Sequence, residues 1–369
     1  MNRQQLLSRL GKRGWPVVYS TGTLSTWDRG GALWQQASWT HQHIETDSVT
    51  VFRTGRLHAY WPKIPVWGRL ARRWMAQRML RVARAKAGRG PFILFLSHPQ
   101  YRPFVELLNP DYVVYHAYDS FSQMSHWNEQ LAEWERELVQ LADLIFCSSR
   151  GVADRLPADG PQRAQVLLNA VDADAFIAGA QGPMPADLAA IPSPRIGYVG
   201  RMSSKIDFAL IAGLAEARPE WQWVLVGPVL PTDESAAVIE RCRRLPNIHF
   251  LGERSFRELP SYTGHCDVNV IPYRQDEGWW WDSSPLKFHE YLAAGKPIVM
   301  SDFGMRLPDE TLAHVADSPR SWEISIERAL LSVRSHDVEA QRLVARANTW
   351  EGRVDQMEEA FAECFRRFP

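Results

Sequence analysis

The stretch that decides the fold runs from Trp279 to Val299 and reads Trp-Trp-Trp-Asp-Ser-Ser-Pro-Leu-Lys-Phe-His-Glu-Tyr-Leu-Ala-Ala-Gly-Lys-Pro-Ile-Val. Its two serines offer hydroxyl caps ahead of a proline, which suits the first turn of a helix. Strong helix formers follow as far as Gly295, where a left-handed residue typically ends a helix. The apolar residues after Pro297 indicate a short buried strand. The stretch therefore predicts a loop, a helix, a turn and a strand.

The start of this predicted helix is suited to a phosphate, because unpaired N–H groups and a partial positive charge gather there. Lys287 adds a cation in the first turn, and Glu290 falls on the same face one turn later. A carboxylate at that position suits the diol of a ribose. The plain alternative is an exposed ion pair on the surface of a helix.

This block resembles the donor-binding motif of GT-B glycosyltransferases, Pro-Leu-Lys-x-x-Glu-Tyr-Leu-Ala-x-Gly-Lys-Pro-Val-Val. Many of those enzymes carry two glutamates eight positions apart, and the matching positions here are Asp282 and Glu290. The shorter Asp282 departs from that pattern. The resemblance implies a nucleotide-sugar site that contains Asp282, Ser283, Ser284, Leu286, Lys287 and Glu290.

The overall composition is that of a globular protein with about two domains. The chain has 369 residues, 45% of them hydrophobic, and its 42 basic residues balance its 42 acidic ones. The four cysteines are scattered, which fits a reducing compartment. We see neither a signal peptide nor a membrane-spanning run, so we expect a cytoplasmic protein, at most peripheral on the inner face of the plasma membrane.

Strands and helices alternate in the first part of the chain, which predicts a Rossmann-like domain. Its first strand leads into Gly22 and Thr23, and the following loop contains Trp27; we expect these three residues to face an acceptor. Two later strands end at polar loops, which place His98, His116 and Asp119 in reach of one cleft.

The segment 67–89 holds eight basic residues and no acidic one. Trp67, Leu70 and Trp74 recur in it at helical spacing. Such a basic amphipathic helix suits an anionic membrane surface. The other interpretation is a helix that packs its tryptophans inward and exposes a basic face.

A second strand-and-helix series begins near residue 195, where Gly200 and Arg201 follow an apolar strand and Lys205 comes next. Two cations at a strand end would neutralise a diphosphate leaving group. The block is similar to the Gly-Arg-x-x-x-Lys signature of the same enzyme class. The region from Val113 to Ser122 resembles that of xanthan-type glucuronosyltransferases, which implies Asp119 as catalytic base and Tyr273 as a further donor contact.

The predicted fold class is therefore α/β, with two Rossmann-like doubly wound domains of the GT-B type facing each other across a cleft. We expect an acceptor domain at 1–176, a linker at 177–194 that is rich in Ala, Gly and Pro, a nucleotide-sugar domain at 195–345, and a helix at 346–369 that returns to the first domain.

The predicted function is transfer of a sugar from a nucleotide sugar to a hydroxyl of a saccharide or lipid-linked acceptor, in bacterial surface polysaccharide or glycolipid synthesis. We expect a UDP sugar rather than a GDP sugar, no separate cofactor, no metal and no nucleic acid. A transferase for a small soluble acceptor, another nucleotide-sugar enzyme such as an epimerase, and a non-catalytic sugar-binding subunit remain alternatives. The sugar, the linkage and the stereochemical course stay open.

Overall fold

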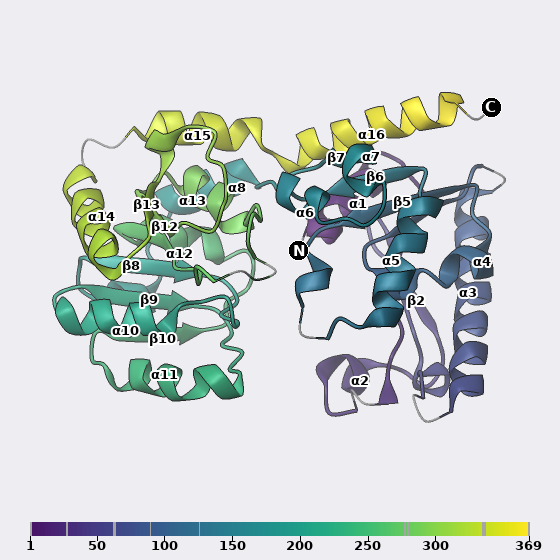
Figure 1. Ribbon diagram of the computed structural model, residues 1–369, viewed down its shortest axis with the longest axis horizontal. Helices are drawn as coiled ribbons and strands as arrows, with labels where there is room; N and C mark the ends of the chain where they lie inside the picture. Colours follow the sequence, from purple (N-terminus) through teal and green to yellow (C-terminus); the bar gives the residue numbers. More distant parts are fainter. Residues whose placement is uncertain are drawn as a thin grey trace.

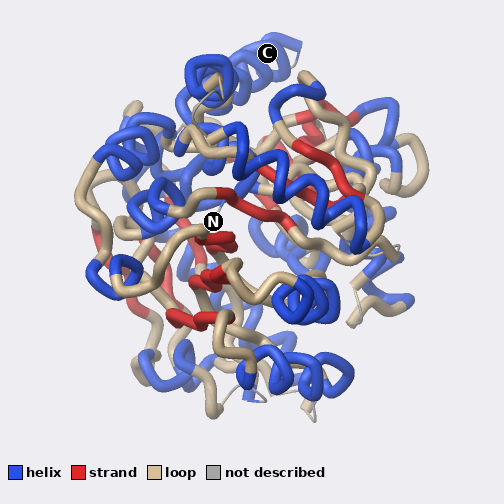
Figure 2. Tube along the Cα trace, turned by 90° about the vertical axis from the view of Figure 1, so that its left-hand side faces the viewer, coloured by secondary structure: helices blue, strands red, loops and turns tan. Residues whose placement is uncertain are grey.

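A computed structural model describes residues 2–26, 29–61, 64–88, 90–124, 126–276, 278, 280–333 and 337–367. Two α/β halves lie side by side, and the long C-terminal helix lies along the top of the N-terminal half (Figure 1). Figure 2 shows the strands in the interior with helices wrapped around them. This architecture confirms the predicted α/β class.

The N-terminal half contains two sheets rather than one. The first has the order β1-β3-β2, in which β2 is antiparallel. The second is fully parallel, with the order β4-β5-β6-β7. The strands are β1 (Val18–Ser20), β2 (Gln42–Glu45), β3 (Thr50–Arg53), β4 (Ile93–Leu96), β5 (Tyr112–Ala117), β6 (Leu144–Cys147) and β7 (Ala164–Val166).

Helices cover both sheets of this half. They are α1 (Asn2–Lys12), α2 (Ala32–Gln36), α3 (Pro65–Ala87), α4 (Phe104–Leu108), α5 (Glu129–Leu141), α6 (Arg150–Asp154) and α7 (Gly160–Arg163), with short 3-10 turns η2 (Arg56–His58), η3 (Pro99–Tyr101) and η4 (Phe121–Gln123). The helix α5 is capped by Asn128, whose side chain accepts a hydrogen bond from the Leu131 backbone, and it buries Leu131, Leu138 and Val139.

The C-terminal half is built on one parallel sheet with the order β10-β9-β8-β11-β12-β13. Its strands are β8 (Arg195–Val199), β9 (Gln222–Val226), β10 (Ile248–Gly252), β11 (Val268–Ile271), β12 (Ile298–Ser301) and β13 (His314–Ala316). The strand order reverses beside β8, which is the place where ligands bind in open parallel sheets. Nearly every residue of β8, β9, β11 and β12 is buried, as a sheet covered on both faces requires.

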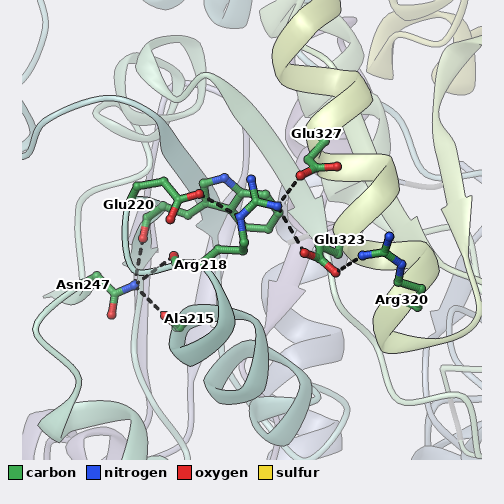
Figure 3. A network of polar contacts seen from close by, with 8 residues as sticks. Ala215, Arg218, Glu220, Asn247, Arg320, Glu323 and Glu327 are labelled. Carbon is green, nitrogen blue, oxygen red and sulfur yellow. Dashed lines mark hydrogen bonds and ion pairs between the residues drawn. The ribbon is translucent and has the colours of Figure 1, made fainter.

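The remaining helices are α8 (Ala173–Gln181), α9 (Ala186–Ala189), α10 (Phe208–Ala217), α11 (Asp233–Arg244), α12 (Leu259–His265), α13 (Leu286–Ala294), α14 (Pro319–Ser332), α15 (Val338–Ala347) and α16 (Trp350–Arg367), with the 3-10 turn η5 (Glu310–Leu312). A polar network joins the end of α10 to α14: Arg218 donates to Glu323 at 3.1 Å and also pairs with Glu220 and Glu327 (Figure 3). Asn247 stabilises the same corner through the carbonyls of Ala215 and Trp221.

Residues 177–194, which we expected to form a linker, include the end of α8 and all of α9. A Cβ at Gly179 would lie 2.3 Å from Pro260, and one at Gly264 would lie 2.2 Å from the Cα of Ala180. Small residues therefore let α8 and α12 approach each other closely. The Ala and Gly content of this segment serves helix packing rather than chain flexibility.

The helix α16 joins the two ends of the chain. Trp350, Val354 and Met357 share one buried cluster with Leu6 and Leu10 of α1. On the rim of that contact Arg9 pairs with Glu351, and Arg13 pairs with Asp355 and Glu358. The backbone of Val171 donates to Asn348 at 3.0 Å, so the two places where the chain passes between the halves lie side by side.

Candidate active site where the two halves meet

Lys287 lies in the first turn of α13 and reaches toward the end of β8. A Cβ at Gly200 would lie 2.4 Å from Lys287 Nζ, and Gly200 itself has a φ of +139°. The ammonium also stands 4.9 Å from the centre of the Tyr198 ring. Tyr291, one helical turn beyond Lys287, accepts a hydrogen bond from the Val199 backbone at 3.0 Å and fixes α13 on the sheet.

Lys205 and Tyr273 form a second pair beside Lys287. The Lys205 ammonium stands 4.5 Å from the centre of the buried Tyr273 ring, which packs against Phe303. The backbone of Arg274 donates to the Lys205 carbonyl at 2.8 Å, so the loop after β8 is tied to the end of β11. Arg201 is exposed on the same loop. Sequence reasoning named these residues, and the structure brings them together.

Burial shapes the electrostatics of this cluster. Desolvation lowers the pKa of the Lys287 ammonium, and it lowers the pKa of Lys205. It also raises the pKa of the half-buried Glu290 carboxyl, while Lys287 acts in the opposite direction. Cations that lack a full hydration shell gain strongly from an anionic ligand. The N-cap Pro285 makes no side-chain hydrogen bond at the start of α13, an end whose helix dipole favours an anion.

The predicted serine caps are wrong. The residue that caps α13 is Pro285, with no side-chain hydrogen bond. Ser284 is buried, its hydroxyl lies 3.4 Å from His289 Nε2, and its carbonyl accepts from Asn169 of the N-terminal half. Ser283 is half-buried and donates from its backbone to Trp280. Neither serine therefore uses its hydroxyl to start the helix.

Asp282 and Leu286, both predicted donor contacts, lie against the N-terminal half. Asp282 has a φ of +56°, and its carboxylate is 3.7 Å from Arg155 of α6. A Cβ at Gly151 would lie 2.0 Å from the Asp282 side chain. Leu286 packs against the cluster that contains Leu6 and Trp350. Asp282 also lies against Gly304 of its own half. Both residues therefore take part in the contact between the halves.

Asp119 follows β5 on the N-terminal side of the same region. Burial raises the pKa of its carboxyl, while the charges of Lys205 and Arg3 act to lower it. The cap residue of the following turn η4 is Ser120, so Asp119 is not needed there. Lys205 belongs to the other half, and its charge thus acts on the candidate base across the contact.

The two histidines take different places. His98 caps η3: its Nδ1 accepts from the Gln100 backbone at 3.1 Å, which leaves the proton on Nε2. Burial lowers the pKa of His98 to about 4, so the neutral ring offers a donor rather than a base. His116 lies inside β5, not in a loop, and is 0% exposed. A side chain without access to ligand does not suit the predicted role of base.

Gly22 lies where another side chain approaches its backbone closely. Its φ is +91°, its carbonyl accepts from Thr54 at 2.7 Å, and a Cβ would lie 2.5 Å from the Tyr101 hydroxyl. Thr23 is exposed next to it. Trp27 and Trp279 lie outside the described residues. Across the described ranges, no three His, Cys, Asp or Glu side chains gather as a metal site requires.

Sequence reasoning missed Arg3. Its guanidinium donates to Ser97 at 3.0 Å, stands 5.2 Å from the centre of the Tyr118 ring and acts on Asp119 and His98. Arg3 belongs to α1, ahead of the first strand and outside every motif. The available signal was the helical spacing of Leu6 and Leu10. That spacing predicts which face of α1 is buried, and the position of Arg3 on the helix follows from it.

Two α/β halves that face each other, each with a parallel sheet, have the architecture of the GT-B fold, and the comparisons with known proteins agree. Residues 193–331 match the family model of the glycosyl transferases group 1. The resemblance to glycosyltransferases noted in the sequence is thereby confirmed for this part of the chain.

One curated relative is TuaH of Bacillus subtilis (strain 168), named for teichuronic acid biosynthesis as a glycosyltransferase. It is 29% identical over 230 residues, which cover 58% of this chain and 55% of TuaH, so the match spans about half the length of that relative.

Solved structures with the same fold include sucrose-phosphate synthase from Thermosynechococcus elongatus, with a TM-score of 0.71 and 17% identity over 99% of this chain and 93% of that one. Anabaena HepE in complex with UDP has a TM-score of 0.65 and 14% identity over 94% of this chain and 100% of that one. At these identities the likeness shows the fold.

Proposed function

We propose that the protein transfers a sugar from a nucleoside diphosphate sugar to a hydroxyl group of a saccharide or lipid-linked acceptor. The donor lies on the C-terminal half, with its diphosphate at Lys287, Lys205 and the start of α13. The acceptor lies on the N-terminal half beside Asp119. The observation that carries the proposal is the position of the Lys287 ammonium against the Gly200 backbone at the end of β8, with the Lys205 ammonium over the neighbouring Tyr273 ring.

In the proposed reaction the acceptor oxygen forms a bond to the anomeric carbon while the bond from that carbon to the phosphate oxygen breaks. The acceptor proton passes to Asp119, and the electron pair of the broken bond stays on the diphosphate. Lys287 and Lys205 neutralise that charge. His98 donates a hydrogen bond from Nε2 to the bound acceptor. A direct displacement of this kind inverts the anomeric configuration.

A UDP sugar is the donor we favour. HepE has been solved with UDP, with UDP and glucose, and with UDP-glucose, on the same fold. Glu290 suits the ribose diol, because its carboxylate follows Lys287 by one helical turn and burial makes a hydrogen-bonded partner favourable.

The donor assignment is tested by the thermal stabilisation of the full chain with UDP, GDP, ADP and TDP. We expect UDP to raise the melting temperature most, and Lys287→Ala to weaken UDP binding at least tenfold. Lys296→Ala, which removes a lysine beyond the end of α13, is the matched control and should bind UDP as the wild type does. Stabilisation by none of the nucleotides would contradict the donor site.

We also propose that the protein works at an anionic membrane surface, on a surface polysaccharide or glycolipid. In the described part of the chain no helix is both long and apolar enough to cross a membrane. The helix α3, however, exposes Val66, Leu70 and Trp74 among its arginines, with Trp74 42% exposed. Trp67 packs edge-on against Trp74 and donates to Ala59. Exposed apolar side chains with basic neighbours support membrane contact.

Sedimentation with phosphatidylglycerol vesicles tests this contact. We expect binding that weakens with salt, that falls with phosphatidylcholine vesicles, and that Trp74→Ser reduces several-fold. Leu331→Ser removes an equally apolar, 85% exposed side chain from α14 and should leave binding unchanged. Equal loss in both variants would contradict a docking face on α3.

A further inference from the structure

The two sheets of the N-terminal half are separated by a cavity of about 450 Å³. The run 15–22 around β1 lines one wall, and the run 90–97 around β4 lines the opposite wall. These strands belong to different sheets. The helix α3 closes one side of the gap with Met75, Met79, Leu80 and Ala83, while α1 and α16 close the other with Leu7, Leu10 and Phe361.

This space is far larger than a packing defect. Protein interiors leave few voids bigger than a water molecule, whereas ligand pockets measure roughly 300–1,000 Å³. Its long walls are apolar: Leu10, Met75, Leu94, Leu96, Phe104 and Leu108 are all buried side chains that line it. Apolar walls give water too few hydrogen-bond partners to be held there. Hydrocarbon is the chemistry that fits them.

One end of the cavity is polar and adjoins the candidate active site. The backbone from Ser20 to Gly22 and the side chains of Ser97, Tyr101 and Arg3 line this end. The Tyr101 hydroxyl lies against Gly22, and its ring contacts His98 edge-on. Arg3 donates to Ser97 and stands 5.2 Å from the centre of the ring of Tyr118, the residue next to Asp119. A cation therefore stands between the apolar space and the candidate base.

The far end is closed by a different arginine. Arg84 of α3 stands 5.6 Å from the centre of the Phe92 ring and donates to the Gly90 carbonyl at 3.0 Å. Arg84 is exposed, whereas Arg3 is half-buried at the end of the cavity near Asp119. The charge beside the candidate base therefore belongs to Arg3.

We propose that this cavity binds the hydrocarbon chain of a lipid-linked acceptor, with its phosphate at Arg3 and its sugar hydroxyl at Asp119. The inference rests on the proposed function, because it names the acceptor of that same site. An amphipathic ligand matches both parts of the lining: the chain lies between β1 and β4, and the anionic head lies at the polar end. The cavity then sets which hydroxyl reaches the donor.

Isothermal titration of the full chain with single-chain alkyl phosphates, each below its micelle concentration, tests the inference. Affinity should rise about fourfold for each added methylene until the cavity is filled. Inorganic phosphate should bind at least a hundredfold more weakly than dodecyl phosphate. Dodecanoate, which carries the charge of a free fatty acid, should bind more weakly than dodecyl phosphate; equal binding of the two would overturn the phosphate part.

Substitutions at two positions test the site of the hydrocarbon chain and the site of the phosphate separately. Ala83→Trp fills the cavity from α3 and should abolish the dependence on chain length, while Gln77→Trp on the exposed face of α3 should leave it intact. Arg3→Gln should weaken dodecyl phosphate but not dodecanol, and Arg3→Lys should restore part of the loss. Unchanged titrations with Ala83→Trp, in a variant that melts as the wild type does, would overturn the inference.

The donor site provides an independent readout. Lys287→Ala should bind dodecyl phosphate as the wild type does and lose UDP binding. If the protein binds UDP but binds no alkyl phosphate, the inference about the cavity is wrong and the proposed function stands. If the protein binds alkyl phosphate but binds no nucleotide, the cavity is a lipid site and the proposed transferase reaction is wrong.

Discussion

The Lys287 side chain passes so close to the Gly200 backbone that a larger residue would collide with it: a Cβ at position 200 would lie 2.6 Å from Lys287 Cε. The same glycine has a φ of +139°, a conformation that side chains rarely adopt. One glycine thereby sets the path of the cation that we assign to the donor diphosphate.

Gly200→Ala should consequently destabilise the protein by roughly 1–3 kcal/mol and weaken UDP binding, because both the backbone and Lys287 must shift. Urea unfolding and UDP titration measure the two effects. The control is Gly213→Ala in α10, where an added Cβ meets nothing within 4 Å. Alanine favours a helix, so this variant should be unchanged or up to about 1 kcal/mol more stable.

Asp119→Asn should lower kcat by about 10²–10⁴-fold at neutral pH, if the carboxylate accepts the acceptor proton. Burial raises the pKa of Asp119, so the wild-type rate should fall as pH decreases through that raised pKa, above the usual range of an aspartate. Asp233→Asn, an exposed aspartate at the start of α11, should leave the rate unchanged. A product with retained anomeric configuration would contradict the role of Asp119 as base.

His116 should make the fold sensitive to acid. Burial lowers its pKa from 6.5 to about 4, so the folded state holds the ring neutral while the unfolded chain takes up a proton. The stability that the neutral His116 ring contributes to the fold is complete above pH 6.5 and is lost as pH falls toward about 4. His116→Phe should remove roughly 2 kcal/mol of the stability difference between pH 7 and pH 5. Urea unfolding at both pH values measures this, and an unchanged difference would refute it.

Trp350→Ala should cost about 3–5 kcal/mol, because it opens a cavity in the cluster that joins α16 to α1. Arg13→Ala removes two ion pairs at the rim of the same contact and should cost about 1 kcal/mol or less. Chemical unfolding compares the two variants. Equal losses would mean that charge, not packing, holds the helices together.

Much of the donor side was predictable, because the chemistry of a diphosphate requires a glycine, cations and a helix start in sequence order. Gly200, Lys205 and Lys287 follow from such local patterns, whereas Tyr273 was implied by the resemblance to xanthan-type glucuronosyltransferases. The contacts of Asp282 and Leu286 could not be predicted from local patterns, since their partners Arg155 and Leu6 lie more than a hundred residues away in the sequence. Local patterns predict which residues one element presents, but not which other element it meets.

The N-terminal half shows the same limit more strongly. Arg3 has no motif, and the gap between β1 and β4 is a property of two sheets that separate rather than of either strand. The apolar run 92–96 predicts a buried strand whether its neighbour is another strand or a hydrocarbon chain. Composition also misled us at 177–194, where small residues bring helices together and do not loosen the chain.

The pairing of α1 with α16 sets an order of events during synthesis. Domains generally fold from the N-terminus as the ribosome releases them, at about 5–20 residues per second. Here the first helix lacks its partners in α16 until residues 350–361 have been made, although Val114, Phe146 and Leu167 of the same cluster are made earlier. The N-terminal half therefore waits, with Leu6 and Leu10 only partly covered, while the C-terminal half is already complete. The half that is translated first is the last to be finished.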